Sequence, residues 1–368
     1  MRFREDIFNN FIRLNRGFDL PDANLVDGSY PVVASTSIKA YHKESRVKGP
    51  GVVTGRSGSL GVVQYIATEH WPLNTALYVK DFKGNHPKFV FYFLQQMHLE
   101  NFNSGAGVPT LNQNHLHKLK INIPELITQQ KIAVILSAYD DLIENNQRRI
   151  ALLEKMAEEI YHEWFVRLRF PCHEKVKTVK GVPTGWEIKK LGAVLELCYG
   201  KALKDGDRVP GEFHVYGSSG VVGTHNEALV KTPSLVVGRK GNVGSVYWPD
   251  RGFFPIDTVY FVKSELPNSF LYFLLRSMNF LNNDAAVPGL NRNQAYSNLF
   301  FLPPTPLVKK YAEVADANFE MKRLFERQNE KLVATRDLLL PRLISGKLSV
   351  ENLDIQFPPS MKEPALEA

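Results

Sequence analysis

Apolar residues between Thr128 and Arg167 recur mostly at alternating steps of three and four residues, the spacing of a coiled-coil seam. Neither proline nor glycine occurs between Glu125 and Phe170, so the pattern predicts one continuous helix. About 40 residues at ~1.5 Å each make a rod of roughly 60 Å, which is too long to bury its apolar stripe on one small domain. The predicted seam consists of Ile132, Ile135, Tyr139, Leu142, Asn146, Ile150, Leu153, Ala157, Ile160 and Trp164.

A second pattern of the same kind runs from Val308 to Ile344, with Gly346 as its predicted stop and Pro341 as a predicted kink or end. Its predicted seam consists of Tyr311, Val314, Asn318, Met321, Phe325, Gln328, Leu332, Thr335, Leu339 and Leu343. The two seams are suited to cover each other, and polar seam residues such as Asn146 would fix their register. The alternative is that each helix packs separately on its own domain.

The segments that precede the two helices are related to each other. Gly55-Arg56-Ser57-Gly58-Ser59-Leu60-Gly61 returns as Gly238-Arg239-Lys240-Gly241-Asn242-Val243-Gly244, and WPLNTALYVK (71–80) returns as FPIDTVYFVK (254–263). VPTLNQN (108–114) likewise returns as VPGLNRN (287–293). One architecture of roughly 180 residues is therefore present twice, and a period of that length predicts two whole domains rather than a solenoid.

The glycine-rich segment around Arg56 allows three interpretations: the loop of a nucleophilic serine, a phosphate-binding loop, or a tight turn between two strands. Ser57 is replaced by Lys240 in the second copy, which argues against a nucleophile. A phosphate-binding loop of the P-loop type requires Gly-Lys-Ser/Thr at the start of a helix, but valines flank this segment on both sides. The sequence therefore predicts a β-hairpin that carries an exposed arginine, Arg56 or Arg239, at its tip.

Composition and charge limit the class of protein. A net charge of +7 suits a nucleic-acid partner. Cys172 and Cys198 have no metal-ligand spacing, so we expect neither a metal nor a cofactor, and a reducing, cytoplasmic location. No run approaches 18 apolar residues, and the first residues lack a signal-peptide pattern, so we expect no membrane partner.

These patterns together predict an α+β protein in which two globular α/β domains, related by a pseudo-twofold axis, are separated by two long antiparallel helices that form a coiled coil. A basic protein with two such heads and a rigid spacer is suited to binding two half-sites of a DNA duplex.

Several segments resemble one known family, the specificity subunits of type I restriction-modification systems. They are ILSAYDDLIENNQRRIALLEKMAEEIYHEWF (135–165), VPTGWEIKKLGAVLELCYGK (182–201), LLLPRLISGKL (338–348), SGAGVPTLNQNHLHKLKINIP (104–124) and AAVPGLNRNQAYSNLFFLPP (285–304). The resemblance implies a non-catalytic subunit with two target-recognition domains, each of which binds half of a split, asymmetric site in double-stranded DNA. It also implies two docked modification (methyltransferase) subunits that bind S-adenosylmethionine, with restriction subunits joining indirectly.

The resemblance implies a division of the chain into five parts. These are a first target-recognition domain (1–125), a first long helix that serves as spacer and docking element (126–170), a second target-recognition domain (171–306), a second long helix (307–348) and a proline-rich tail (349–368). We expect that tail to be disordered or strapped onto the rest of the protein.

Base recognition uses arginine or lysine for guanine, asparagine or glutamine for adenine, and small hydroxyl groups for either base. The candidate DNA-binding residues in matching loops of the two copies are Ser35, Thr36, Lys39, His42, Lys43, Arg56, Ser57, Gln113, Asn114, Ser218, Ser219, His225, Arg239, Lys240, Arg292 and Asn293. Arg56 and Arg239 are kept in both copies, which favours phosphate contacts. The Ser57/Lys240 and Gln113/Arg292 pairs differ, which favours base contacts. The alternative for the asparagines is that they satisfy turn backbone.

The alternative function is a coiled-coil assembly scaffold whose end domains bind protein. Identification of the natural partner would distinguish this scaffold from a DNA-binding specificity subunit. A nuclease or a methyltransferase is disfavoured because no Asn-Pro-Pro-Tyr or Asp-Pro-Pro-Tyr motif occurs. Asp140 and Asp141 are adjacent on the first helix, where neighbouring residues do not share a face, so we expect them to be solvated or to contact a partner.

Overall fold

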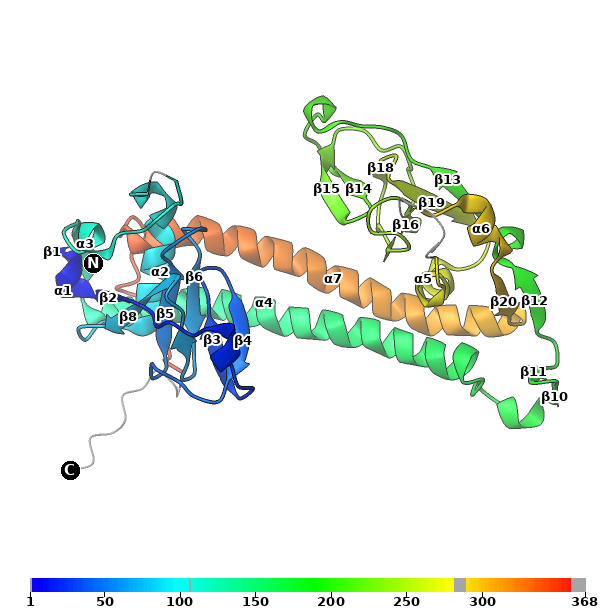
Figure 1. Cartoon of the computed structure of the whole chain (residues 1–368), viewed down its shortest axis with the longest axis horizontal. Helices are drawn as coiled ribbons and strands as arrows, with labels where there is room; N and C mark the ends of the chain where they lie inside the picture. Colours follow the sequence, from blue (N-terminus) through cyan, green and yellow to red (C-terminus); the bar gives the residue numbers. More distant parts are fainter. Residues whose placement is uncertain (1, 106, 281–288, 359–368) are drawn as a thin grey trace. The chain divides into compact units, whose positions relative to one another are not determined.

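The computed structural model describes residues 2–105, 107–280 and 289–358. It forms two compact units: unit 1 comprises Met1–Asn145 with Asn329–Ala368, and unit 2 comprises Asn146–Gln328. Both unit boundaries fall within the long helices, so each unit contains one head and one segment of each helix (Figure 1). The division into five parts stays a prediction. Val287 and Pro288 of the repeated motif, and tail residues 359–368, lie outside the described residues.

The head of unit 1 contains three small sheets. Their strand orders are β2(Arg13–Arg16)-β8(Ala76–Asp81)-β5(Gly51–Gly55)-β6(Val63–Ile66), β4(Ile38–His42)-β3(Tyr30–Val33)-β7(Trp71–Pro72) and β1(Phe3–Ile7)-β9(Lys120–Pro124). Its helices are α1(Phe8–Phe11), α2(Pro87–Gln96) and α3(Gln113–Leu116), with short 3₁₀ turns at Asp22–Asn24 and Leu99–Phe102.

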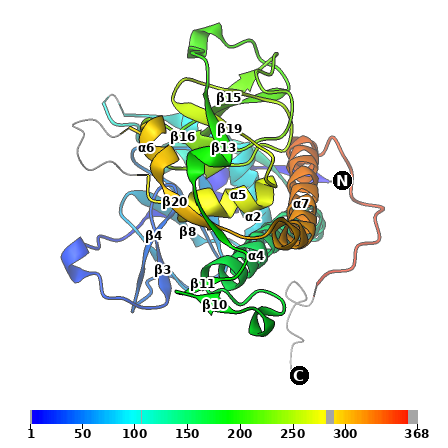
Figure 2. The ribbon, with the colours of Figure 1, turned by 90° about the vertical axis from the view of Figure 1, so that its right-hand side faces the viewer.

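The head of unit 2 repeats this arrangement strand for strand. Its sheets are β13(Leu195–Tyr199)-β19(Val259–Ser264)-β16(Val236–Gly238)-β17(Val246–Tyr247), β15(Gly220–His225)-β14(Phe213–Gly217)-β18(Phe253–Pro255) and β12(Glu187–Lys190)-β20(Leu299–Leu302) (Figure 2). It adds the ribbon β10(Thr178–Val179)-β11(Val182–Pro183), helices α5(Asn268–Ser277) and α6(Arg292–Ser297), and 3₁₀ turns at His173–Lys175, Leu191–Ala193 and Asp205–Asp207. The α+β class and the duplicated domain are thus confirmed.

The glycine-rich segment forms the predicted hairpin in both heads. Strands β5 and β6 pair antiparallel, with Val53 opposite Gln64, and β16 pairs in the same way with β17. Gly58 and Gly61 have φ of 85° and 90°, and Gly241 and Gly244 both have φ of 78°, values that suit glycine better than any other residue. A strand rather than a helix follows each loop, which excludes the phosphate-binding loop.

The two long helices are α4(Leu126–Tyr161), which continues into a π-helical turn at His162–Val166, and α7(Thr305–Ile344). Their segments run antiparallel within each unit. In unit 1, Nη1 of Arg336 lies 2.7 Å from Oδ1 of Asp140, and Asn329 Nδ2 donates to the carbonyl of Ile143 at 3.3 Å. In unit 2, the Tyr311 hydroxyl donates to the carbonyl of Ala157 at 3.1 Å. Pro341 lies inside α7, and Gly346, with φ of 75°, follows its end as predicted.

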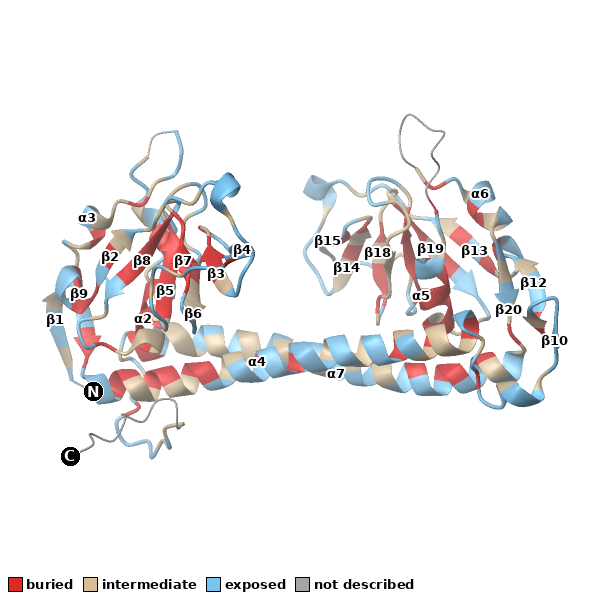
Figure 3. Ribbon diagram, turned by 60° about the horizontal axis from the view of Figure 1, so that its bottom comes forward, coloured by how far each residue is buried: buried red, intermediate tan, exposed pale blue. Residues whose placement is uncertain are grey.

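Four of the ten predicted seam positions of α7 are displaced by one residue. The exposed fractions of the predicted seam residues Val314 and Met321 are 42% and 45%, and that of Leu142 on α4 is 52%. The predicted seam positions Gln328 and Thr335 are also exposed. The less exposed residues are instead Ala315, Lys322, Asn329 and Arg336, which recur every seven residues: Ala315 is buried, and the other three contact α4. Figure 3 shows that buried and half-buried positions alternate with exposed ones along both long helices.

The physical reason is that three of these four inward residues are polar and have partners on α4. Lys322 Nζ lies 3.4 Å from Oε2 of Glu154, and Asn329 and Arg336 make the bonds described above. The heptad spacing gives no sign of these partners, so it placed the seam at the preceding positions, two of which are the polar residues Gln328 and Thr335. Asp140, expected to be solvated or to contact a partner protein, instead pairs with Arg336 and accepts a hydrogen bond of 2.5 Å from the Tyr92 hydroxyl.

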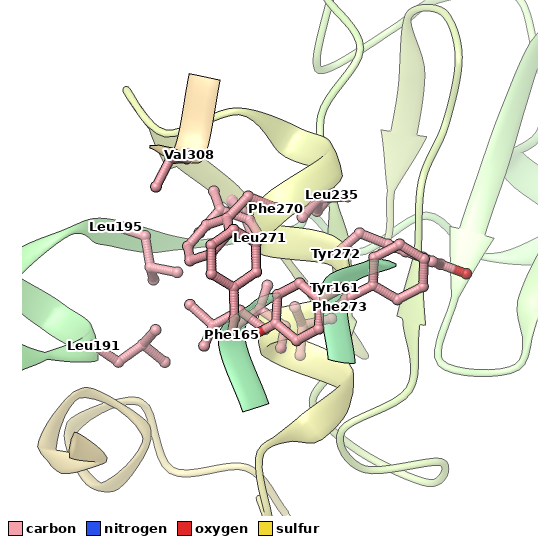
Figure 4. Close-up of a cluster of buried hydrophobic side chains, with 14 of the residues drawn as sticks. Tyr161, Phe165, Leu191, Leu195, Leu235, Phe270, Leu271, Tyr272, Phe273 and Val308 are labelled. Atoms are coloured by element: carbon pink, nitrogen blue, oxygen red, sulfur yellow. The ribbon is translucent and has the colours of Figure 1, made fainter. Parts of the chain in front are cut away.

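Each head packs on the long helices through its ten-residue helix, α2 or α5. In unit 2, Phe270 and Phe273 of α5 contact Tyr161 of α4, and Phe165 belongs to the same buried cluster (Figure 4). The ring of Tyr311 contacts that of Phe165. In unit 1, residues of α2 share a core with residues of both long helices, namely Phe89, Phe93, Ile132, Leu136, Leu343 and Ile344. The long helices are thus part of the core of each unit.

The start of the tail is strapped onto unit 1. Val350 is 1% exposed, and Lys131 Nζ of α4 donates to the carbonyls of Glu351 and Leu353 at 2.9 and 2.8 Å. The strapped alternative predicted from the sequence therefore holds for this part of the tail.

Candidate nucleic-acid interface

Two adjoining hollows in the head of unit 1 share Gln113 and Asn114 in their walls, with volumes of about 320 Å³ and 800 Å³. Their polar lining is rich in amides and cations, and it contains no carboxylate among the described residues. We call this lining the amide surface. It consists of Asn9, Asn10, Arg13, Asn15, Arg16, Arg56, Asn112, Gln113, Asn114, His117 and Lys118.

The amide surface is assembled from segments about a hundred residues apart in the chain. Strand β1 pairs with β9, which places the N-terminal segment beside the residues that follow α3. His117 Nε2 accepts the backbone N–H of Leu14 at 3.1 Å, which fixes α3 to β2. Burial and the neighbouring Arg13 lower the pKa of His117, so the imidazole is neutral and able to accept this bond near pH 7.

The glycine-rich hairpin holds the segment that presents Gln113. The carbonyl of Arg56 accepts the N–H of Leu111 at 2.8 Å, and Asn112 Oδ1 then accepts the N–H of Asn114 at 2.9 Å. Gln113 is thereby fixed as the first residue of α3. This capping role agrees with the alternative in which asparagines of this motif satisfy turn backbone.

The head of unit 2 builds the same frame from equivalent residues. The carbonyl of Arg239 accepts the N–H of Leu290 at 2.8 Å, and Asn291 Oδ1 accepts the N–H of Asn293 at 2.9 Å. The Tyr296 hydroxyl accepts the N–H of Leu197 at 2.8 Å, as His117 does for Leu14. The side chain in the place of Gln113 is Arg292.

The side chains around this second frame differ in chemistry from the amide surface. Tyr199, which is 50% exposed, occupies the place of Arg16 in the register of β2 with β8 and of β13 with β19. Its ring centroid lies 5.2 Å from the guanidinium of Arg292 and 5.0 Å from that of Arg239. Glu196 corresponds to Arg13 in the sequence, because each directly precedes the equivalent leucine, Leu197 or Leu14.

The prediction that Arg56 and Arg239 are exposed hairpin-tip residues was wrong. Both are half-buried at the ends of β5 and β16. Their Nη1 atoms donate to the carbonyls of Asn74 at 3.3 Å and Asp257 at 3.1 Å, because the glycines let the loop turn back over the head. A phosphate contact by either arginine stays a prediction.

Two other candidate residues are not exposed as the sequence suggested. Ser35 is 9% exposed, and its hydroxyl donates to the carbonyls of Ser57 and Thr75 at 3.1 and 2.8 Å. His42 is 3% exposed, and its Nδ1 accepts the N–H of Val26 at 3.1 Å. The equivalent His225 is half-buried and accepts the N–H of Val209. These side chains brace loops because strand ends leave backbone groups without ladder partners.

The remaining candidates occupy loops and strand ends. Exposed positions are Thr36, Lys39, Lys43, Asn114, Ser219, Lys240 and Asn293, while Ser57, Gln113, Ser218 and Arg292 are half-buried. Lys39 forms an ion pair of 2.5 Å with Asp22, and Lys43 lies 3.8 Å from Glu44. Of the predicted residues in unit 1, the amide surface brings together Arg56, Gln113 and Asn114.

Sequence reasoning missed the contribution of the N-terminal segment. Asn9, Asn10, Arg13, Asn15 and Arg16 line the hollows but belong to no repeated motif. The sequence feature that could have identified this segment is its composition, because asparagine and arginine are interspersed with buried apolar residues from Phe8 to Leu14.

The described residues contain no group of three or more His, Cys, Asp or Glu side chains that could hold a metal ion. None of the helices within the described ranges is long and apolar enough to cross a membrane.

Comparison with known proteins places these features in a family. Residues 5–155 match the family model of the type I restriction modification DNA specificity domain. The type I restriction enzyme MjaIX specificity subunit of Methanocaldococcus jannaschii is 25% identical over 354 residues, which cover 83% of this chain and 79% of that protein. The HindI specificity subunit of Haemophilus influenzae is 25% identical over 360 residues, covering 71% and 77% of the two chains.

A solved structure supports the fold. The S subunit of a type I restriction-modification system from M. genitalium aligns with a TM-score of 0.64 at 17% identity, covering 93% of this chain and 96% of that one.

The duplicated head and the long helices accompany a similarity to one class of protein, the specificity components of type I restriction-modification complexes. Residues 5–155 carry the type I restriction modification DNA specificity domain, and most of the chain is similar to type I restriction enzyme specificity subunits.

Proposed function

We propose that each head of this chain binds one half of a bipartite, asymmetric site in double-stranded DNA. The observation that carries the proposal is the pair of equivalent frames, which present Gln113 in one head and Arg292 in the other. Equivalent backbone frames in the two heads would bring both heads to DNA in the same geometry. Different side chains on these frames would then select different bases, which gives two different half-sites. The proposal includes the division into five parts predicted from the sequence, in which the two heads are the target-recognition domains.

The lining of the amide surface supports a nucleic-acid ligand over a protein ligand. Amides can both donate to and accept from base edges, and Arg13, Arg16 and Lys118 add positive charge for the phosphates. Carboxylates, which the polyanion would repel, are absent from the described lining.

The long helices dock two modification subunits in this proposal, and these bring S-adenosylmethionine and methylate adenine. Restriction subunits join the complex through them. Exposed apolar side chains on α4 and α7 supply contact area. They are Leu142 and Leu338 in unit 1, which are 52% and 72% exposed, and Leu152, Met156 and Met321 in unit 2, which are 60%, 54% and 45% exposed.

Methylation mapping of the host genome tests the proposal. Deletion of the gene for this chain should abolish adenine methylation at one bipartite motif, and complementation should restore it. Affinity purification of the tagged chain should recover a methyltransferase subunit. A chain that assembles with partners while the methylation pattern is unchanged by its deletion would instead support the assembly scaffold.

A further inference from the structure

We propose that residues 113 and 292 occupy one equivalent base-contacting position, at which Gln113 selects adenine and Arg292 selects guanine. Tyr199 is proposed as the positioning residue of Arg292. The inference rests on the proposed function and specifies which base each head selects at this position.

The two positions are equivalent in three independent contacts. Each follows an asparagine whose Oδ1 accepts the N–H of the next residue but one. Each is held by a leucine N–H that donates to the carbonyl of the hairpin arginine. In each head the residue four positions further along the chain, His117 or Tyr296, accepts a backbone N–H from the neighbouring strand. A ligand that meets both heads in the same orientation meets Gln113 and Arg292 at the same place.

Both side chains keep hydrogen-bonding capacity for a ligand. The Oε1 atom of Gln113 is buried and has no hydrogen-bond partner among the described residues, so it is an unsatisfied acceptor in a side chain that lines both hollows of the amide surface. The guanidinium of Arg292 contacts the rings of Tyr199 and Tyr296, at 5.2 and 6.0 Å. Within the described ranges it makes neither a hydrogen bond nor an ion pair, so its planar fork of donors is available.

The chemistry of the two groups differs in the manner that base recognition requires. A glutamine amide offers one donor and one acceptor, which match N7 and N6 of adenine in the major groove. A guanidinium offers two parallel donors, which match O6 and N7 of guanine. Neither pattern satisfies the other base.

The aromatic contact distinguishes Arg292 from a free surface arginine. A guanidinium stacked on a ring loses less conformational freedom when it binds, because its plane is already set. Arg239 lies on the same ring at 5.0 Å and donates to the carbonyl of Asp257, so Tyr199 is itself held. In the head of unit 1 the place of Tyr199 is taken by Arg16, which forms an ion pair of 3.3 Å with Asp19.

The experiment is selection from a library of random duplexes by the complex of the full chain with its modification subunits. The variants are Gln113→Arg, Gln113→Ala, Arg292→Gln, Tyr199→Phe and Tyr199→Ala. His115→Ala and Gln294→Ala are matched controls, because these residues occupy equivalent exposed positions on α3 and α6.

We expect Gln113→Arg to change adenine to guanine at one position of one half-site, and Arg292→Gln to make the opposite change in the other half-site. The preference should shift by roughly 5- to 150-fold. Gln113→Ala should lose the adenine preference without gaining guanine. Tyr199→Ala should weaken the guanine preference, whereas Tyr199→Phe should retain it because the ring remains. If the hydroxyl alone mattered, Tyr199→Phe would weaken the preference as much as Tyr199→Ala.

Selection of the wild-type motif by Gln113→Arg and Arg292→Gln complexes would overturn the inference and leave the proposed function standing. A change in both half-sites from one substitution would also overturn it. A wild-type complex that selects no sequence at all would overturn both. Unaltered motifs in the two control variants are required for the assignment to hold.

Discussion

Arg336 of α7 and Asp140 of α4 form an ion pair of 2.7 Å, although the sequence pattern places Thr335 rather than Arg336 in the seam. Their side chains are 28% and 24% exposed, and the Tyr92 hydroxyl of the head donates to the same carboxylate. One carboxylate therefore joins both long helices and the head of unit 1.

Removal of the cation should destabilise unit 1 because Asp140, whose side chain is 24% exposed, would lose its ion-pair partner. We expect Arg336→Ala to lower the free energy of unfolding by about 1–3 kcal/mol. Arg342→Ala, at an exposed position of the same helix, is the control and should change it by less than about 0.5 kcal/mol. Urea denaturation followed by circular dichroism measures both. Equal stability of the two variants would show that the pair contributes nothing net.

A matching network in unit 2 gives a pH dependence. Burial alone would raise the pKa of Glu154, but Lys322, the Tyr272 hydroxyl and Arg276 outweigh it and lower the pKa below the ordinary value of 4.5. A carboxyl whose pKa is lower in the folded than in the unfolded state stabilises the fold above its unfolded pKa, and this contribution is lost as pH falls through the folded value.

Glu154→Gln should therefore be less stable than the wild-type protein at pH 7, and the difference should shrink as the pH falls below 4.5. Thermal unfolding at a series of pH values measures this difference, with Glu320→Gln, at an exposed position of α7, as the control. A difference between wild type and Glu154→Gln that is constant from pH 7 to pH 3 would contradict the argument.

The duplicated heads, the hairpin and both long helices could be predicted from the sequence because their signals are local: paired motifs, glycines at turns, and apolar periodicity. Four predicted seam positions of α7 were wrong because Lys322, Asn329 and Arg336 are stabilised by partners on α4, and the spacing of apolar residues cannot detect such partners. The exposure of Ser35 and His42 was predicted wrongly for the same reason. The sequence does not show that a polar side chain has a hydrogen-bond partner inside the protein.

The amide surface was predicted only in the half that repeats. Gln113 and Asn114 lie in a motif present twice, so comparison of the copies singled them out. Arg13 and Arg16 have different residues at the equivalent places, Glu196 and Tyr199, so the same comparison could not find them. Strand pairing, not sequence proximity, brings them to the surface.

The unequal charge of the two equivalent surfaces predicts unequal salt dependence. Arg13→Ala and Lys118→Ala should each weaken binding to all sequences similarly and reduce the salt slope by about one charge. Glu196→Ala, at the sequence position that corresponds to Arg13, should not weaken binding. DNA titrations at several salt concentrations measure the slopes. A loss of base preference in Arg13→Ala with an unchanged slope would make Arg13 a base-contacting residue instead.

Exchange of the first head should alter half of the recognised site. Replacement of residues 1–125 by the same region of a related subunit should change the bases of one half-site and leave the other half-site as it was, because each head has its own complete frame for Gln113 or Arg292. Methylation mapping in cells that carry the chimera reads both halves at once. Changes in both halves would contradict independent heads.

A fragment that ends near Glu187 tests the pairing of the long helices most directly. It retains the head of unit 1 and α4 but lacks Leu343 and Ile344, so the buried face that includes Ile132 and Leu136 loses its cover. Exposure of each such side chain costs about 1.5–3 kcal/mol, so the fragment should homodimerise through α4. In the sequence repeat, Ala157 of α4 stands where α7 has Arg336, so Asp140 would lose its cation in that dimer. Asp140→Ala should therefore weaken the full chain but strengthen the fragment dimer. Sedimentation equilibrium measures the dimer, and a monomeric fragment with an intact helix would refute the pairing.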